Sequence, residues 1–340
     1  MVQCWLMNSR CFTLTVAGAA AAAVLMLPPR AAADQVSQAG TPGTAIRPGQ
    51  QASEPEHRCA SDNPAVFWRC AQEKATAFDP PRTADGRPDF SGYWRHGTEA
   101  KEDLEAPWDN RARVGASRER ERDAGPGKSM IVDPPDGKVP LQPWAEVQKR
   151  ENEARYIDQN THCFLSGVPR FMYEAGAYQV LQAPEYITIL SEEAHAFRVI
   201  AMDGRPRIAK NIRLWLGDAR GRWEGDTLVI ETTNLNGRVF LDRRGRFYTD
   251  AATVTERFTM LDQNTIAYGA TVDDPFVYTR PFTIAFMLRR HTTEGFEIWE
   301  DACFEGNKDV EHLYSIGLRK YPGITSADVP ALKARTPGAR

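Results

Sequence analysis

The sequence lacks the short motifs that mark nucleotide-binding loops, hydrolase elbows and metalloprotease helices. It contains no G-x-G-x-x-G or G-x-x-x-x-G-K loop, no G-x-S-x-G and no H-E-x-x-H. No C-x-x-C or H-x-x-x-H pair occurs either, so the usual zinc patterns are missing. These absences favour a protein that uses neither a cofactor nor a metal.

The chain also lacks a strong charge of either sign. It has 42 basic and 45 acidic residues, a formal net charge of −3. Residues 1–33 contain Arg10 and Arg30 and no acid, so the rest carries 40 basic against 45 acidic residues, or −5. Such a balance is not typical of proteins that bind nucleic acid or anionic membranes.

Long apolar runs are absent after the first 33 residues. Arg10 supplies a positive start, residues 12–27 are apolar and rich in alanine, and small residues end at Ala33. This pattern predicts a secretory signal peptide over residues 1–33, cleaved near Ala33. The run is shorter than the ~20 residues of a spanning helix. We therefore expect a periplasmic or secreted protein without membrane insertion after cleavage.

Four cysteines follow the predicted signal peptide: Cys59, Cys70, Cys163 and Cys303. An even number in an exported chain indicates two disulfides. Three connectivities are possible. We favour Cys59–Cys70 as a local link and Cys163–Cys303 as a link between the start of the strand region and its last strand.

Composition divides the chain into five stretches. Residues 58–177 hold a proline-rich arm (78–94), a highly charged insertion (101–128) and two short helices near 59–77 and 145–160. The stretches are a signal peptide (1–33), a flexible leader (34–57), the N-terminal arm, insertion and helix (58–177), a strand region (178–310) and a C-terminal tail (311–340).

The strand region consists of short alternating apolar and polar runs separated by Gly, Pro, Asp and Asn. Its centre, residues 211–234, has two expected strands on either side of a glycine-rich turn. Short strands at regular spacing predict an all-β fold, here an up-and-down, lipocalin-like barrel of about eight to nine strands. The expected strands are 178–182, 186–190, 196–202, 212–216, 227–233, 253–261, 265–272, 277–289 and 295–304.

Charged residues occupy the apolar phase of three expected strands. Glu256 and Glu300 alternate in step with buried-type residues, and so does Arg280. Buried charges are costly unless they are paired. Two interpretations follow. Arg280 could form a structural ion pair with Glu256 or Glu300, or the carboxyl groups could serve acid–base chemistry in an apolar pocket.

His195 begins an expected strand in phase with Phe197 and Val199, which makes it a candidate base or hydrogen-bond donor, although a lone histidine is more often structural. We expect Arg198 to line a rim or to lie in solvent. Aromatic residues in the strand region provide either core packing or the lining of a pocket for an aromatic molecule. The candidates for that lining are Trp215, Trp299, Tyr268 and Tyr278, with Arg280 beside them.

Several segments resemble a large family of exported bacterial proteins, most of them uncharacterised. The resemblance covers about residues 80–310 and implies a lipocalin-like (calycin-like) barrel, but no general activity. Members of that family have histidine where this chain has Arg207, Thr253 and Phe304, which argues against a histidine-based site. The resemblance rests on RTADGRPDFSGYW (82–94), GVPR (167–170), DGRP (203–206), WLGDARGRWEGDTLVIETTN (215–234), ERFT (256–259) and ACFEGN (302–307).

These observations predict a cofactor-independent periplasmic lyase, hydratase or isomerase. Its substrate would be a small hydrophobic, aromatic molecule such as a lignin-type dimer held in the barrel. His195 or one of Glu256 and Glu300 would act as base, the other carboxyl group as acid, and Arg280 would hold an anionic oxygen. The alternatives are a non-catalytic carrier of a lipophilic molecule, and an envelope scaffold whose barrel is filled by side chains.

Overall fold

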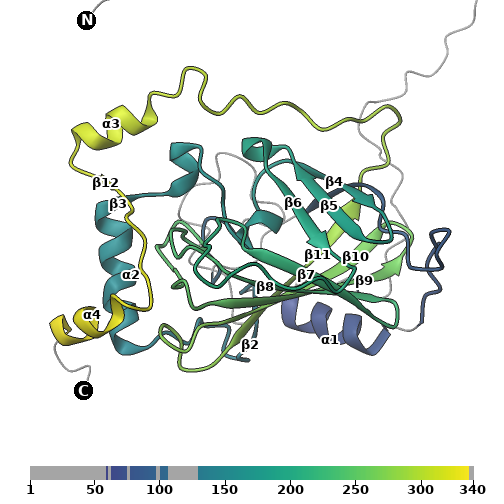
Figure 1. Ribbon diagram of the computed structural model, residues 1–340, viewed down its shortest axis with the longest axis horizontal. Helices are drawn as coiled ribbons and strands as arrows, with labels where there is room; N and C mark the ends of the chain where they lie inside the picture. The colour runs from purple at the N-terminus through teal and green to yellow at the C-terminus, as the bar shows by residue number, and fades with distance from the viewer. Residues whose placement is uncertain (1–58, 60–62, 75–76, 97–99, 106–128, 337–340) are drawn as a thin grey trace, which may run out of the picture. The chain divides into compact units, whose positions relative to one another are not determined.

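The computed structural model describes residues 59, 63–74, 77–96, 100–105 and 129–336 (Figure 1). The expected signal peptide (1–33), the leader (34–57) and residues 106–128 of the charged insertion lie outside the described residues. Among the described helices, none combines the length and apolar character that crossing a bilayer requires.

Within the described residues, nine strands close into a barrel, which confirms the predicted all-β barrel. Consecutive strands from β4 to β11 are neighbours, and β1 pairs with both β4 and β11 to close the ring. The strands are β1 (Gly92–His96), β4 (Ala177–Gln182), β5 (Tyr186–Ser191), β6 (Phe197–Ala201), β7 (Asp218–Glu224), β8 (Thr227–Thr233), β9 (Thr253–Asp262), β10 (Thr265–Asp273) and β11 (Phe282–Arg290).

One pair of neighbours departs from a purely up-and-down barrel. β6 and β7 run parallel, and a single pair, Ala201 with Arg220, joins them. The connection from residue 202 to 217 has no regular structure apart from an isolated bridge at Leu214, so the predicted strand 212–216 is not formed. The expected glycine-rich turn is instead strand β7, which pairs with β8 along its whole length around a tight turn at Gly225.

Alternation along the strands fills the barrel interior. In β9, Val254, Phe258 and Met260 are buried, and their partners across the pair with β10 include Tyr268 and Ile266. Side chains of one face of each strand thus meet inside the ring, and burying their apolar surface is the main favourable term for the fold.

Figure 1 shows the remaining elements outside the ring of barrel strands, with α2, β3, α3, β12 and α4 together at one side. They are the helices α1 (Pro64–Lys74), α2 (Pro143–Arg155), α3 (Asp309–Ser315) and α4 (Val329–Arg335), the short strands β2 (Ile131–Asp133), β3 (Tyr156–Ile157) and β12 (Arg319–Lys320), and the 3₁₀ turns η2 (Gln159–His162), η3 (Arg170–Met172) and η4 (Glu193–His195). β2 extends the sheet beside β11, and β3 pairs with β12.

Helix α1 covers the outer face of β10 and β11. Phe67 and Ala71 pack on Ala267, and the ring of Trp68 lies directly on Gly269. A Cβ at position 269 would come within 2.3 Å of that ring, so glycine is required for this close approach. The predicted Cys59–Cys70 disulfide is present, and its buried Cys59 belongs to the same small apolar cluster.

Residues 234–252 form a mostly buried loop. Its apolar side chains join the main core, and its backbone bonds to polar side chains from other segments. Its main-chain oxygens accept side-chain hydrogen bonds: Tyr173 donates to Leu241 at 2.8 Å, and Tyr278 donates to Phe247 at 2.7 Å. Gln159 donates to the oxygen of Phe240 at 3.0 Å. Buried irregular backbone must be paired, and these side chains supply the partners that a sheet would otherwise give.

The N-terminal arm lies against the barrel at the β7–β8 hairpin. Arg82 forms a double hydrogen bond with Asp226 of the hairpin turn at 2.9 and 3.1 Å. The ring of Phe90 stacks on Trp223, with centroids 5.7 Å apart. Gln182 of β4 accepts from the amide of Phe90 at 3.0 Å. The arm continues into β1. The barrel therefore includes one strand from the N-terminal stretch 58–177, outside the predicted strand region 178–310.

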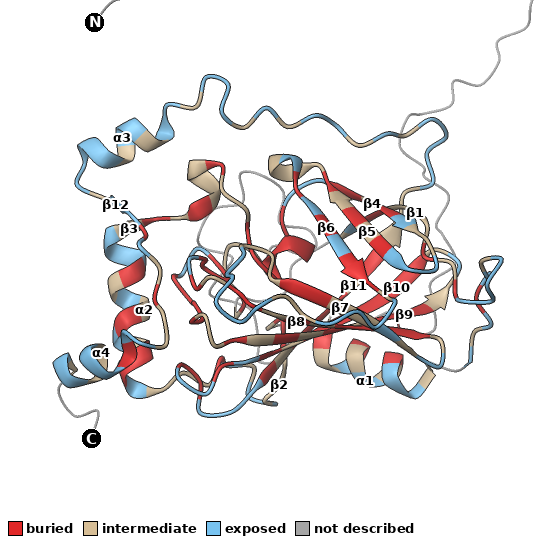
Figure 2. Cartoon of the chain, viewed as in Figure 1, coloured by how far each residue is buried: buried red, intermediate tan, exposed pale blue. Residues whose placement is uncertain are grey.

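The predicted strand over residues 295–304 is wrong. Residues 291–308 have no helix or strand, and none of them is buried (Figure 2). The segment is held by the predicted disulfide Cys163–Cys303 and by two hydrogen bonds to η4 and the residue before it. The amide of Trp299 donates to Glu192 at 3.0 Å, and the amide of Ala194 donates to Asp301 at 2.8 Å.

Candidate functional site in the barrel interior

The barrel interior contains a buried ion pair between Arg198 of β6 and Glu256 of β9. Both side chains are almost fully enclosed. Nη1 of Arg198 donates to Oε1 of Glu256 at 2.9 Å, and Nη2 donates to Oε2. This two-pronged geometry is the strongest arrangement that an arginine and a carboxylate can make.

Two hydroxyl groups complete this cluster. Tyr268 of β10 donates to Oε1 of Glu256 at 2.9 Å, and Thr232 of β8 accepts from Nη2 of Arg198 at 2.7 Å. Each member comes from a different strand. Tyr268 and Thr232 each lie two residues along from the register partner of Glu256, Ala270 on β10 and Ile230 on β8, so they face the same side of the sheet as those partners and reach Glu256 and Arg198 diagonally. We call Arg198, Glu256, Tyr268 and Thr232 the polar cluster.

The surroundings of Arg198 keep its guanidinium charged. Burial alone would lower the pKa of Arg198, but the adjacent Glu256 carboxylate outweighs it and raises the pKa. Burial raises the pKa of the Tyr268 phenol well above its usual value, and the Glu256 charge raises it further. Tyr268 is therefore a neutral hydrogen-bond donor over the physiological range.

An apolar cavity of about 10 Å³ lies next to the polar cluster, which is room for about one water molecule. Phe258 belongs to its wall and contacts the ring of Tyr268, with centroids 4.9 Å apart. Phe90 of the arm lies between this cavity and Trp223. The wall is made by Phe90, Trp94, Met172, Tyr178, Val180, Ile187, Ile189, Leu228, Phe258, Ile266 and Leu288.

The structure separates the three predicted catalytic residues. Glu256 is enclosed in the barrel, but His195 and Glu300 lie outside it, with 56% and 87% of their side chains exposed. Their Nε2 and Oε1 atoms are 3.9 Å apart at the surface. The sequence predicts that Glu300 points inward from a strand over residues 295–304. That strand is not formed, so Glu300 lies at the surface.

The partner predicted for Glu256 is also wrong. Arg280 precedes β11 and is exposed, where it forms an ion pair with Asp133 at 2.7 Å. Arg198, expected at a rim or in solvent, takes the inward position instead. The sequence pattern predicts that Phe197 and Val199 are on the apolar face of β6, but they are 62% and 52% exposed, so the predicted inward face of β6 is wrong.

The predicted aromatic lining divides between interior and surface. Tyr268 belongs to the polar cluster, and Tyr278 is buried with its hydroxyl bound to the backbone of Phe247. Trp215 is partly buried against Phe164, with ring centroids 5.4 Å apart. Trp299 is 77% exposed, so it is a surface residue outside the barrel interior.

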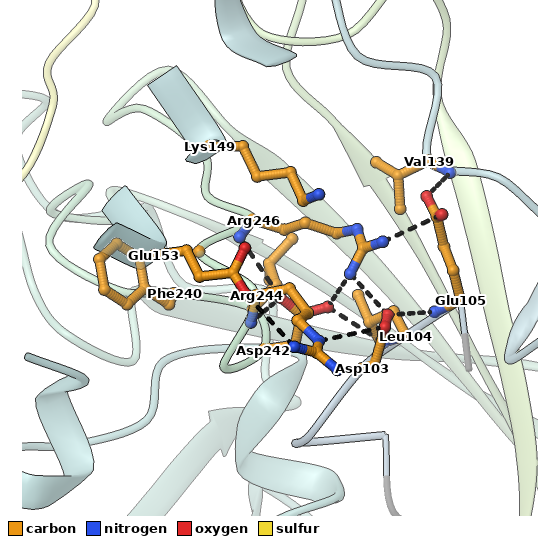
Figure 3. A network of polar contacts seen from close by, with 12 residues as sticks. Asp103, Leu104, Glu105, Val139, Lys149, Glu153, Phe240, Asp242, Arg244 and Arg246 are labelled. Carbon is orange, nitrogen blue, oxygen red and sulfur yellow. Dashed lines mark hydrogen bonds and ion pairs between the residues drawn. The ribbon is translucent and has the colours of Figure 1, made fainter. Parts of the chain in front are cut away.

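A second polar network is centred on Arg246 in the buried loop (Figure 3). Its guanidinium binds Asp242, Asp103 at 2.7 Å and Glu105 at 3.0 Å. Burial raises the pKa of Asp242 and the neighbouring Arg246 opposes that effect. This network fixes residues 103–105 to the loop, a structural role that explains its charges without invoking a ligand.

A third network surrounds the buried Arg170. Asp158 binds its terminal nitrogens at 2.7 and 3.2 Å, and Glu174 binds its Nε. Burial raises the pKa of Glu174 to about 7, against the opposing effect of Arg170 and with a further rise from Glu193. The charge of Glu174 therefore changes near neutral pH.

No group of three His, Cys, Asp or Glu residues with metal-binding geometry occurs among the residues that the structure describes. Comparisons of the chain with protein-family models, with curated proteins and with solved structures find no match.

Proposed function

We propose that this chain is an exported binding protein that takes up a small apolar molecule at the apolar cavity of its barrel. The main support is that the cavity wall is entirely hydrophobic or aromatic and that Phe90 of the arm forms part of it. Ligand sites of binding barrels have this composition, with few polar groups that fix orientation.

The contacts that hold the arm support uptake at this end. Arg82 and Asp226 are partly exposed, and exposed ion pairs contribute only about 0–1 kcal/mol. The cavity holds about one water, so a ligand must displace Phe90 to gain room. Moving the arm also exposes the buried ring of Phe90 and breaks its amide bond to Gln182, so uptake requires a ligand that buries comparable apolar surface in return.

Export is part of this proposal. The two disulfides indicate an oxidising, extracellular-type compartment. The signal peptide pattern of residues 1–33 and the resemblance to exported lipocalin-like proteins support the same assignment, with the periplasm as destination.

Binding is tested with N-phenyl-1-naphthylamine, a neutral apolar fluorophore, on the oxidised protein. Phe90→Ala enlarges the cavity and should tighten binding at least about tenfold, since a filled apolar volume is worth about 1.4 kcal/mol or more. Phe197→Ala removes an equal side chain from the outer face and is the matched control. If neither wild type nor Phe90→Ala takes up the probe, the barrel is a packed core and the proposal fails.

The arm is tested by the rate of uptake. Arg82→Ala should speed probe entry, because it removes the double hydrogen bond to Asp226. Arg205→Ala removes a comparable exposed pair with Asp203, far from the arm in sequence, and should leave the rate unchanged. Equal rates for both variants would mean that the arm does not control access.

Catalysis is the second candidate, and one observation favours it: Glu256 and Tyr268 adjoin the cavity wall through Phe258. We propose a lyase or isomerase step on a small hydrophobic or aromatic molecule, in which this pair moves a proton. The surface residues His195 and Glu300 have no part in it. The expected result is turnover of aromatic dimers by wild type that is lost in Glu256→Gln, measured at a temperature where urea unfolding shows this destabilised variant still folded and where it still binds the dimers.

A further inference from the structure

The join between β6 and β7 is the weakest in the ring. β6 pairs with β5 along its whole length, but only Ala201 pairs with β7, at Arg220. These two strands run parallel, whereas every other neighbouring pair of the nine barrel strands is antiparallel. Strands of alternating direction close into a ring only when their number is even, so a parallel pair occurs where one strand is missing. The chain passes from β6 to β7 through residues 202–217 without supplying that strand.

The main-chain groups of Phe197 and Val199 point toward the place of the missing strand. At the start of the β5–β6 ladder, the amide of Ser191 donates to the oxygen of Ala196 at 2.8 Å. Bonded and non-bonded pairs alternate along an antiparallel ladder, so Arg198 bonds to β5, and Phe197 and Val199 direct their N–H and C=O groups away from it. Among the described residues, these groups of Phe197 and Val199 have no hydrogen-bond partner.

The outer face beside this edge is apolar and exposed (Figure 2). The side chains of Phe197 and Val199 are both more than half exposed, and the neighbouring Leu181 of β4 and Tyr186 of β5 face the same side. Free strand edges of natural proteins are normally charged, very short or covered. An edge flanked by exposed apolar side chains is instead the kind of surface to which an extended segment adds as a further strand.

Acidic groups lie where β6 begins and decide which segment fits. Residues 292–307 contain five carboxyl groups and no lysine or arginine. The bond from the amide of Trp299 to Glu192 holds this stretch beside η4, directly before β6. The exposed carboxyl group of Glu300 lies 3.9 Å from the ring of His195, two residues before Phe197. A cationic side chain at this end of the edge would find a complementary charge.

We propose that the edge of β6 takes up an extended segment of another protein as an added strand, antiparallel to both β6 and β7. Its main chain bonds to Phe197 and Val199, and its apolar side chains at alternate positions cover theirs. Because the added strand runs opposite to β6, its C-terminal end lies beside η4. The partner segment is therefore an alternating apolar sequence that ends in arginine or lysine, which faces Glu300. This surface is separate from the cavity of the proposed function.

The test uses two heptapeptides of alternating threonine and valine, one with arginine at its C-terminal end and one with arginine at its N-terminal end. Both have amidated C-termini and a fluorophore on a glycine-serine spacer, and binding to the oxidised full chain is followed by anisotropy. The C-terminal arginine should tighten binding about threefold to fivefold, the size of an exposed ion pair. Glu300→Gln should remove this difference. Asp273→Asn is the control, because this exposed carboxyl group lies at the end of β10 far from Arg290, where residues 291–308 begin.

Val199→Pro tests the backbone contact. It removes an N–H that points to the added strand and breaks no bond to β5, a position where proline is tolerated. It should weaken binding of the C-terminal arginine peptide at least about tenfold, whereas Val199→Thr, of similar shape with the N–H retained, should stay within about threefold. Phe197→Ala removes apolar cover and should also weaken binding, without changing uptake of the naphthylamine probe.

Four results would overturn the inference: neither peptide binds, both peptides bind equally, Val199→Pro binds as well as wild type, or wild type is a dimer that Val199→Pro dissociates. The last result would make a second copy the occupant of the edge. Each of them leaves the proposed function standing, because the naphthylamine probe reports on the cavity alone. If Val199→Pro fails to fold, the order preference of wild type and its loss in Glu300→Gln decide the matter.

Discussion

Replacing Glu256 by glutamine should destabilise the fold by about 3–5 kcal/mol, because Arg198 then stays charged and uncompensated inside the barrel. The structure accounts for this size. The substitution removes the negative charge from two hydrogen bonds to Arg198 and from the bond donated by Tyr268. Hydrogen bonds to charged groups contribute about 1.5–3 kcal/mol each, and an amide oxygen can replace one of them only in part.

Removing the whole cluster should cost much less than breaking it. The combined variant Arg198→Met, Glu256→Leu and Tyr268→Phe leaves apolar side chains of similar volume and no buried charge. Such replacements are often neutral or stabilising. We expect an unfolding free energy within about 2 kcal/mol of wild type, with Thr232 left short of one partner.

Urea unfolding at pH 7, followed by tryptophan fluorescence with both disulfides oxidised, measures these differences. Asp133→Asn is the control, since it breaks an exposed pair with Arg280 and should cost no more than about 1 kcal/mol. A loss below about 1 kcal/mol for Glu256→Gln would refute the reasoning. So would a combined variant as unstable as the single one.

Three further predictions concern the rest of the chain. The pKa of Glu174 is raised from 4.5 to about 7, so the folded state binds this proton more tightly than the unfolded state does. The resulting contribution to the unfolding free energy, on the order of 1–3 kcal/mol, is present below pH 4.5 and lost as the pH rises through 7. Glu174→Gln should flatten this pH dependence of the unfolding free energy, measured by urea unfolding. Replacing Cys163 and Cys303 by serine should lower the unfolding free energy by about 3–5 kcal/mol, because the link closes a long loop, and an unchanged urea midpoint would contradict this. Arg246→Met should cost about 3–5 kcal/mol by stranding Asp242, whereas a thermal midpoint equal to wild type would show that the network is dispensable.

Local patterns predicted much of this fold. The alternation of apolar and polar residues predicts the bounds of β9 and β10 nearly to the residue. The even number of cysteines and the favoured pairing predict both disulfides. These features depend on neighbours in sequence or on a small number of combinations. The sequence predicts an extended arm where the structure has β1, because only the distant partners β4 and β11 make Gly92–His96 a strand.

The candidate site was half predictable. Glu256 was placed correctly from its apolar phase, but its partner Arg198 was not, because Phe197 and Val199 drew the apolar phase of β6 to the wrong face. Ile200 shares a face with Arg198, and a buried carboxylate demands a cation, so pairing the two inward charges could have found it. Glu300 failed for another reason: alternation over residues 295–304 is present in the sequence, but no neighbouring strand pairs with it.

The closing pair of the barrel joins Trp94 with Arg290, near opposite ends of the described chain. Sheet formation from β4 to β11 can proceed between sequence neighbours, but the ring stays open until β11 meets β1. Contacts of such high sequence separation slow folding, because a long loop must be closed before they form. Until that step, two strand edges stay unpaired, and unpaired edges invite association with other chains. The protein should therefore be most prone to aggregate as a nearly complete chain, so truncation before β11 would yield insoluble material.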